Sequence, residues 1–115
     1  MVVDLLSDDA TDRIFHALAD STRRDILARA TRQERSVSAL ARHYPMSFAA
    51  VQKHVAVLER AALVTKERRG REQIVRGNRD TLHRAAALLE AYEQLWIERA
   101  KQIADVLLGE EGSTP

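Results

Sequence analysis

Residues 37–60 read VSALARHYPMSFAAVQKHVAVLER, which is two helical segments separated by a proline. Pro45 cannot continue a helix and biases Tyr44 away from helical angles, so the first segment must end before the proline. A new helix can begin after Ser47, because a serine side chain accepts a hydrogen bond from the unpaired N–H groups of a first helical turn. The stretch therefore predicts two helices joined by a tight turn.

The helix expected after Ser47 has two chemically different faces. Apolar side chains recur at intervals of 3, 4 and 3 residues, the spacing of a buried helix face, and these expected core residues are Phe48, Val51, Val55 and Leu58. The outward face is small or polar and carries Ala49, Ala50, Lys53, Ala56 and Arg60, with Gln52 and His54 at its margins. Small side chains there allow the helix to approach another surface closely.

Three shorter helices are expected before this one. The first is expected to open with Ser7, Asp8 and Asp9, the second to begin with Asp20 as its N-cap, and the third to begin near Ser36, because short polar side chains are favoured at helix N-termini. Helical spacing predicts that the buried residues are Ile14, Phe15 and Leu18 in the first, Ile26, Leu27 and Ala30 in the second, and Val37, Leu40 and Ala41 in the third. These helices and the one after Ser47 are expected to form a small head.

After residue 62 the pattern changes from helix to strand. Residues 63–68 and 72–76 are rich in β-prone side chains and flank Gly70, which predicts a hairpin. Its expected tip carries Arg68, Arg69 and Arg71. A simple connection does not require this much positive charge.

A long helix is expected over residues 78–108. About 28 helical residues would extend for ~42 Å, more than a small four-helix head can cover. Much of its apolar face therefore needs a second chain. The expected dimer contacts are Leu82, Leu89, Tyr92, Trp96, Ile103 and Leu107.

The charges are distributed unevenly along the chain. Residues 21–79 contain 14 Lys and Arg against five Asp and Glu, a net charge of +9. Residues 1–20 and 80–115 each carry a net charge of −4, so the total of +1 conceals the pattern. A basic centre between acidic ends indicates one face that is suited to a polyanion.

Composition excludes several classes of protein. The 115 residues suffice for one domain, and the absence of cysteine excludes disulfides, thiolate metal sites and cysteine nucleophiles. Ser, His and Asp are present without a nucleophile elbow, phosphate loop or zinc motif, so no enzyme activity is expected. The first six residues lack a basic leader region, and no apolar run approaches the roughly 18 residues that span a bilayer. A cytoplasmic protein with no membrane partner is therefore expected.

The order helix, turn, helix and basic hairpin predicts a winged helix-turn-helix that binds double-stranded DNA. The expected fold is mainly α with a small β-hairpin and a long C-terminal dimerisation helix. Residues 1–108 would form a single domain, with a DNA-binding head over 8–78 and the dimerisation helix over 79–108. Residues 109–115 would form a flexible tail.

Two segments resemble the ArsR-type family of regulators. Residues 18–27, LADSTRRDIL, resemble the opening of that family, and residues 46–61, MSFAAVQKHVAVLERA, resemble its recognition helix. Residues 63–64 and 69–71 resemble its wing. The similarity covers residues 12–108 and implies a repressor that acts by occupying an operator. If the repressor is a two-fold dimer, its operator is expected to be an inverted repeat. The chain departs from the common family pattern at Ser21, Pro45, Ala62 and Gly77, and the last of these is expected to loosen the exit from the wing.

The resemblance and the exposed helix face together predict the DNA contacts. The expected contacts are Ser47, Ala49, Ala50, Gln52, Lys53 and His54 on the recognition helix and Arg68, Arg69 and Arg71 on the wing. Two interpretations stay open for His54, Arg23 and Arg24: contact with phosphate, or bonding within the head. RNA binding is disfavoured because Phe48, an aromatic residue on the recognition helix, is expected to be buried.

No effector can be identified from the sequence. Classical ArsR-type members sense metals through cysteine pairs on the third helix, where residues 37–41 contain no ligand. Other members use His and carboxylates on the last helix, where Asp80 and His83 lie without an evident second pair, so no metal site or cofactor is expected. Two alternatives remain: a metal-responsive regulator that uses these His and carboxylate ligands, and a helical protein-interaction module without DNA binding.

Overall fold

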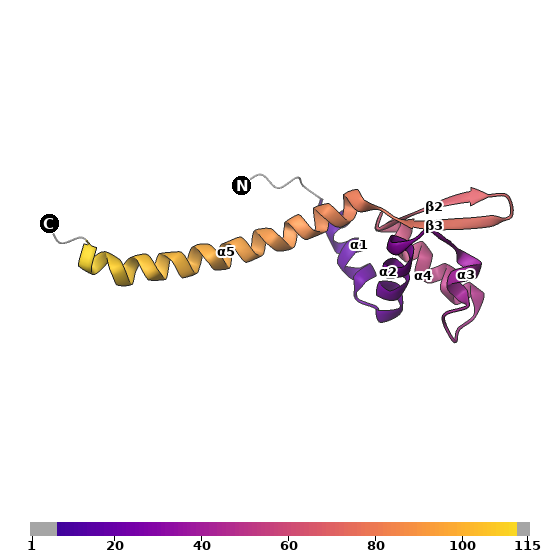
Figure 1. Cartoon of the computed structure of the whole chain (residues 1–115), viewed down its shortest axis with the longest axis horizontal. Helices are drawn as coiled ribbons and strands as arrows, with labels where there is room; N and C mark the ends of the chain where they lie inside the picture. Colours follow the sequence, from indigo (N-terminus) through magenta and orange to yellow (C-terminus); the bar gives the residue numbers. More distant parts are fainter. Residues whose placement is uncertain (1–6, 113–115) are drawn as a thin grey trace.

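The computed structural model describes residues 7–112, which form a small head and one projecting helix (Figure 1). The helices are α1 (Asp8–Leu18), α2 (Ser21–Arg32), α3 (Val37–Ala41), α4 (Phe48–Arg60) and α5 (Arg79–Gly112). The strands are β1 (Arg35–Ser36), β2 (Val64–Arg69) and β3 (Glu72–Gly77). The β2–β3 hairpin and α5 leave the head in opposite directions. The predicted winged helix-turn-helix with a long C-terminal helix is confirmed.

The predicted helix starts are also confirmed. The side chains of Ser7, Asp20, Ser36 and Ser47 each accept a hydrogen bond from the backbone N–H three residues later, at 3.0–3.1 Å. A cap of this kind contributes about 1 kcal/mol to helix stability. Local chemistry therefore sets where four of the five helices begin.

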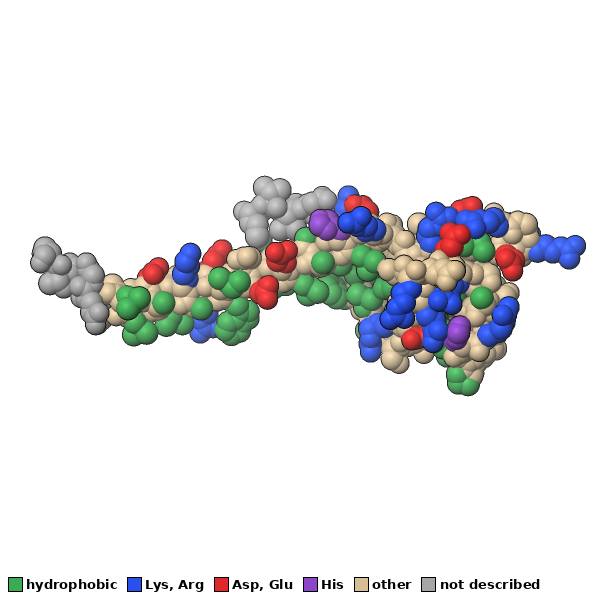
Figure 2. Space-filling view, viewed as in Figure 1, with side chains coloured by type: hydrophobic (Ala, Val, Ile, Leu, Met, Phe, Trp, Pro, Cys, Tyr) green, Lys and Arg blue, Asp and Glu red, His purple; other side chains and the backbone are tan. Residues whose placement is uncertain are grey.

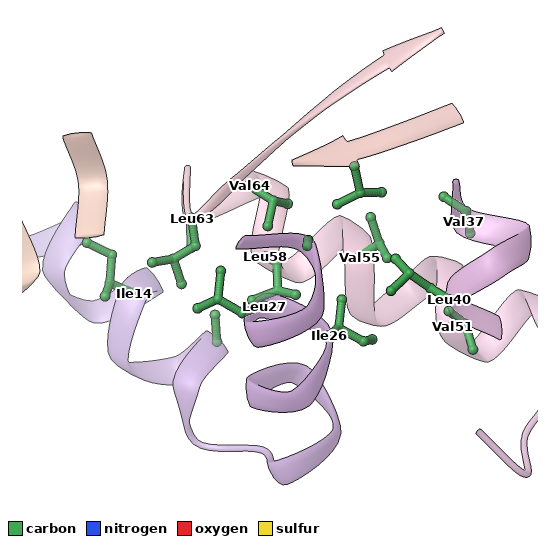
Figure 3. Close-up of a cluster of buried hydrophobic side chains, with 14 of the residues drawn as sticks. Ile14, Ile26, Leu27, Val37, Leu40, Val51, Val55, Leu58, Leu63 and Val64 are labelled. Atoms are coloured by element: carbon green, nitrogen blue, oxygen red, sulfur yellow. The ribbon is translucent and has the colours of Figure 1, made fainter. Parts of the chain in front are cut away.

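The core of the head lies between α1, α2, α3, α4 and the sheet (Figure 3). Its largest fully buried side chains are Ile14, Ile26, Leu40, Val51, Val55, Leu58, Leu63, Val64 and Val75. Leu18 and Ala41 are only partly buried, but they pack against this cluster.

The expected burial of two aromatic residues is wrong. Phe15 is 37% exposed and Phe48 is 46% exposed. Helical spacing gives the direction of a side chain around the helix axis, but it does not show whether another element lies there. Phe48 occupies the first residue of α4, where the helix begins.

The sheet has three antiparallel strands in the order β1-β3-β2. Only the hairpin is predicted from the sequence, because β1 has two residues and is too short to show a strand period. Arg69 pairs with Glu72, which leaves a two-residue loop. Gly70 opens this loop with φ +62°, a conformation that favours glycine and suits a tight hairpin turn.

Gly77, at the end of β3, is explained by the close approach of α2. A Cβ atom at this position would lie 2.5 Å from Thr31 Oγ1 and 3.1 Å from Thr31 Cα. Any larger residue would force α2 away from the strand. The sequence led us to expect that Gly77 loosens the exit from the wing. Instead, the glycine allows α2 to pack against the strand.

Only the beginning of α5 packs on the head. Thr81 and Ala85 are buried, Leu82 packs against the core, and every residue from 92 to 109 is exposed. The radius of gyration is 20.6 Å, against about 13 Å for a compact domain of this size. No helix in residues 7–112 is long and apolar enough to cross a membrane.

The end of α5 differs from the predicted boundary at residue 108. The helix continues to Gly112, so residues 109–112 are helical rather than part of a tail. A single glycine such as Gly109 costs a helix about 1 kcal/mol relative to alanine, which is too little to end it. Residues 1–6 of the predicted domain and residues 113–115 of the predicted tail lie outside the described residues.

Candidate nucleic-acid interface

The outward face of α4 presents the residues predicted to contact DNA. Ser47, Ala49, Gln52 and Lys53 are exposed, whereas Ala50 and His54 are half-buried. The opposite face of the helix is anchored in the core. A helix with short exposed side chains fits the B-DNA major groove, which is about 12 Å wide.

The turn between α3 and α4 is held by a polar cluster on α2. The Tyr44 hydroxyl donates to Asp25 Oδ2 at 2.6 Å, and Arg29 Nε donates to the same oxygen at 2.8 Å. The bond from Tyr44 and then the bond from Arg29 lower the pKa of Asp25. Burial, followed by the bond to Asp25, raises the pKa of Tyr44 to about 12. These bonds hold Tyr44, which lies in the turn before the recognition helix, against α2.

His54 on α4 is bonded within the head to Arg23 of α2. Arg23 Nη1 lies 3.3 Å from His54 Nδ1, and the same guanidinium donates to the carbonyl oxygens of Ala17 and His16 at 2.8 and 3.0 Å. A guanidinium only donates, so His54 Nδ1 is the acceptor when this contact forms a hydrogen bond. The Arg23 side chain is 12% exposed, which supports the internal role over a phosphate contact.

Arg24 also bonds within the head, since its Nη1 donates to the Leu18 carbonyl at 2.7 Å. Both arginines therefore bond the chain at the end of α1.

The three wing arginines occupy different environments. Side chains alternate between the faces of a strand, so Arg69 shares a face with Glu67, whereas Arg68 shares the face of the buried Val64. Arg69 Nη1 lies 2.8 Å from Glu34 Oε1, and its Nε lies 3.3 Å from Glu67 Oε1. The pKa of Arg69 is raised, first by Glu34, and the pKa of Glu34 is lowered, first by Arg69.

Arg76 of β3 completes this arrangement. It contacts Glu67 Oε2 at 2.8 Å and Glu34 Oε2 at 3.3 Å. Glu34, Glu67, Arg69 and Arg76 thus form a four-residue network with no net charge, here called the wing brace. Its two arginines add little to the positive potential of the head.

Arg68 and Arg71 remain as the free cations of the hairpin. Arg68 Nε donates to the Gly70 carbonyl at 3.2 Å, and Arg71 is exposed in the turn. Neither has a carboxylate partner within residues 7–112. They are the wing side chains best placed to meet a polyanion.

Two exposed residues near α4 were not among the predicted contacts. Arg42 lies exposed in the turn between α3 and α4. Its position between the two predicted helices could have identified it as a candidate contact from the sequence. Phe48 begins α4 and is exposed beside Ser47. Its exposure removes the argument against RNA binding that depended on its burial.

Asp80 and His83 line an open hollow at the start of α5. Asp80 Oδ2 lies 3.4 Å from Arg84 Nε, so this carboxylate is already paired. Within residues 7–112, no group of three or more His, Cys, Asp or Glu residues is arranged to hold a metal ion.

The space-filling view separates the basic and apolar surfaces of the molecule. Lys and Arg gather over the head and hairpin, and hydrophobic side chains follow one side of α5 (Figure 2). Five of the predicted dimer contacts are exposed along α5, namely Leu89, Tyr92, Trp96, Ile103 and Leu107. The sixth, Leu82, packs against the core of its own head.

Comparisons with known proteins agree with this arrangement. Residues 18–67 match a family described as a helix-turn-helix domain. The chain is 33% identical over 103 residues to the HTH-type transcriptional regulator Rv2034 of Mycobacterium tuberculosis, covering 90% of this chain and 94% of the relative.

Solved structures of regulators have the same fold. An ArsR-like transcriptional regulator from Rhodococcus sp. RHA1 is 33% identical with a TM-score of 0.74, covering 85% of this chain and 92% of that one. A homodimeric winged helix-turn-helix DNA-binding domain from Mycobacterium bovis, a possible ArsR-family regulator, is 26% identical with a TM-score of 0.62, covering 82% of this chain and 92% of that one. The fold, the exposed recognition helix and these similarities show that the chain belongs to the ArsR family of winged helix-turn-helix transcriptional regulators and is not an enzyme.

Proposed function

We propose that this regulator is a homodimer that binds an inverted-repeat operator in double-stranded DNA and represses transcription by occupying it. The exposed, small-residue face of α4 beside the two free wing arginines is the observation that carries DNA binding. Repression follows from the resemblance to the family.

Each element of the head has a distinct part in this proposal. Gln52 and Lys53 contact base edges or adjacent phosphates, while Ser47, Ala49 and Ala50 allow the helix to enter the groove. His54 contacts Arg23 through Nδ1, so Nε2 is the ring nitrogen left for a contact with the DNA.

On the wing, Arg68 and Arg71 contact phosphates or the minor groove. For Arg69 the proposed role is different from the DNA contact expected from the sequence. Two carboxylates occupy its guanidinium, so its role is to hold the wing in place.

The apolar side of α5 supports the homodimer. Apart from Phe15 and Phe48, all exposed large hydrophobic residues in the described part lie on this helix. Thr81, Ala85, Tyr92 and Trp96 occur at intervals of 4, 7 and 4 residues, so the face that packs on the head continues as the exposed stripe. The homodimeric relative from Mycobacterium bovis is consistent with a second copy as the partner.

A footprint on the DNA that flanks the gene of this protein tests the proposal. A two-fold dimer is expected to protect an inverted repeat whose half-site centres lie about 34–36 Å apart, or a multiple of that distance. If about 6–10 phosphates are neutralised, affinity should fall by about 10³–10⁵ between 50 and 200 mM salt. An affinity that does not change over this range would contradict DNA binding through the basic head.

Three substitutions separate the expected roles on the protected site. Lys53→Ala and Gln52→Ala should weaken binding to the operator more than binding to unrelated DNA, because base contacts carry sequence information. Arg71→Ala should weaken both equally, as a phosphate contact does. Equal losses on both DNAs for Lys53→Ala and Gln52→Ala would remove these residues from base reading.

A further inference from the structure

Phe48 is an exposed aromatic residue on the surface proposed to meet DNA. It is 46% exposed and occupies the first position of α4, directly after Ser47. No aromatic neighbour contacts its ring within the described chain. In water, such a side chain leaves a large apolar area unburied, which a bound ligand could cover.

The fold does not need Phe48 at this position. Ser47 caps α4 through its bond from the Ala50 N–H at 3.1 Å, and Met46 packs against the core cluster that includes Val51. Val51, Val55 and Leu58 anchor the helix. The start of α4 is therefore specified without the aromatic ring.

The neighbours of Phe48 indicate the kind of ligand that would cover it. Gln52 lies four residues later, so the two side chains are neighbours on one flank of the helix, and Gln52 is exposed. Major-groove edges of base pairs present polar atoms, and thymine alone adds an apolar 5-methyl group, which Phe can contact. An amide side chain such as Gln52 is suited to adenine.

From this juxtaposition we infer that Phe48 is a specificity-determining residue that contacts the 5-methyl group of one thymine in each half-site. The inference depends on the proposed DNA binding and adds the base class that α4 selects. Gln52, one helical turn away, contacts the neighbouring part of the same half-site.

Uracil in place of thymine tests this contact, because the two bases differ only by the methyl group. Each thymine of the footprinted operator is replaced by deoxyuridine, one position at a time, and affinity for the full-length protein is measured. One position per half-site should lower wild-type affinity about four-fold, the value of one buried methyl group. Replacing both symmetric thymines should lower it about 16-fold if the two half-sites contribute independently.

The same pairs of DNA are then measured with three variants. Phe48→Ala and Phe48→Gln should bind the thymine and uracil operators equally, because the apolar contact is gone. Lys53→Ala should bind both more weakly but keep the four-fold ratio. Circular dichroism should show folded variants, since Phe48 is outside the core.

The possible failures are distinguishable. If the wild-type protein protects no duplex DNA, the proposed function fails. If the protein protects DNA but its affinity does not change when uracil replaces thymine, only the role of Phe48 is overturned. The same conclusion follows if Phe48→Ala and Phe48→Gln still bind the thymine operator more tightly than the uracil operator. Preferential binding of single-stranded nucleic acid, with no dependence on the methyl group, would instead indicate that the ring stacks on bases.

Discussion

Arg69 on the wing donates a hydrogen bond of 2.8 Å to Glu34, a residue 35 positions earlier in the chain. Glu34 precedes β1, so the contact joins the hairpin to the other edge of the sheet. Because the carboxylate satisfies Arg69, the positive charge of this side chain is compensated before any DNA arrives.

The salt dependence of DNA binding should therefore distinguish two wing arginines. Each lost phosphate contact reduces the slope of log affinity against log salt by about 0.9. Arg71→Ala should reduce the slope by about 1.8 in a dimer, whereas Arg69→Ala should leave it unchanged and lower affinity only by loosening the wing. Fluorescence anisotropy titrations at several salt concentrations measure both slopes. Equal reductions would show that Arg69 leaves Glu34 and contacts phosphate.

The bond between Tyr44 and Asp25 predicts a pH-dependent loss of stability. Tyr44→Phe should destabilise the protein by about 1 kcal/mol at pH 7, the net value of one hydrogen bond. The folded-state pKa of Asp25 is lowered, so this stabilisation is present above the unfolded pKa of about 3.9 and is lost as pH falls through the folded value. Urea unfolding of both proteins at pH 7 and near pH 3 measures the difference. A difference that grows on acidification would contradict this assignment.

Trp96 predicts a link between dimerisation and DNA binding. It is 67% exposed in the protomer, with the Arg99 guanidinium 5.6 Å from its ring centre. If a second copy buries it, Trp96→Ala should weaken the dimer by about 3–5 kcal/mol per packed site and reduce operator affinity, although no DNA-facing residue changes. Sedimentation measures the dimer, and Gln94→Ala on the other side of α5 is the control. A monomeric wild-type protein at micromolar concentration would be inconsistent with the assignment.

The left-handed backbone conformation of Ala62 predicts that glycine at this position stabilises the protein. It has φ +59° and follows α4, where its N–H bonds to the Glu59 carbonyl at 2.9 Å and the Leu63 N–H bonds to the Leu58 carbonyl at 3.0 Å. Glycine is preferred at this position of a helix end, because a Cβ is strained at positive φ. Ala62→Gly should raise stability by about 1 kcal/mol and the melting temperature by about 4 °C.

Ala61→Gly is the matched control for this substitution. Ala61 has φ −81°, so glycine relieves no strain there and should lower the melting temperature. Thermal unfolding of the two variants should thus show shifts of opposite sign. A decrease for Ala62→Gly would show that the left-handed conformation is not strained.

Features that depend on near neighbours in the chain could be predicted from the sequence alone. Ser47 caps α4 because its side chain reaches an N–H three residues away, and Pro45 separates the two helices through its own ring. Gly70 allows the tight wing turn through its own φ. The axial spacing of Val51, Val55 and Leu58 likewise defines a buried face within one helix. Each signal is local, so it can be recognised in the printed chain.

Which of the remaining side chains find partners depends on contacts between residues that are far apart in the chain. Spacing alone placed Phe48 in the core, yet the side chain is 46% exposed, whereas Val51 in the same turn of α4 is fully buried. Arg69 and Arg71 are equally basic in the sequence, but only Arg69 meets a glutamate that is 35 positions away. Arg23 and His54 meet across 31 positions. Such partners are chosen by how the helices and sheet pack together, and that packing decides which charges and apolar surfaces stay available to DNA or to a second chain.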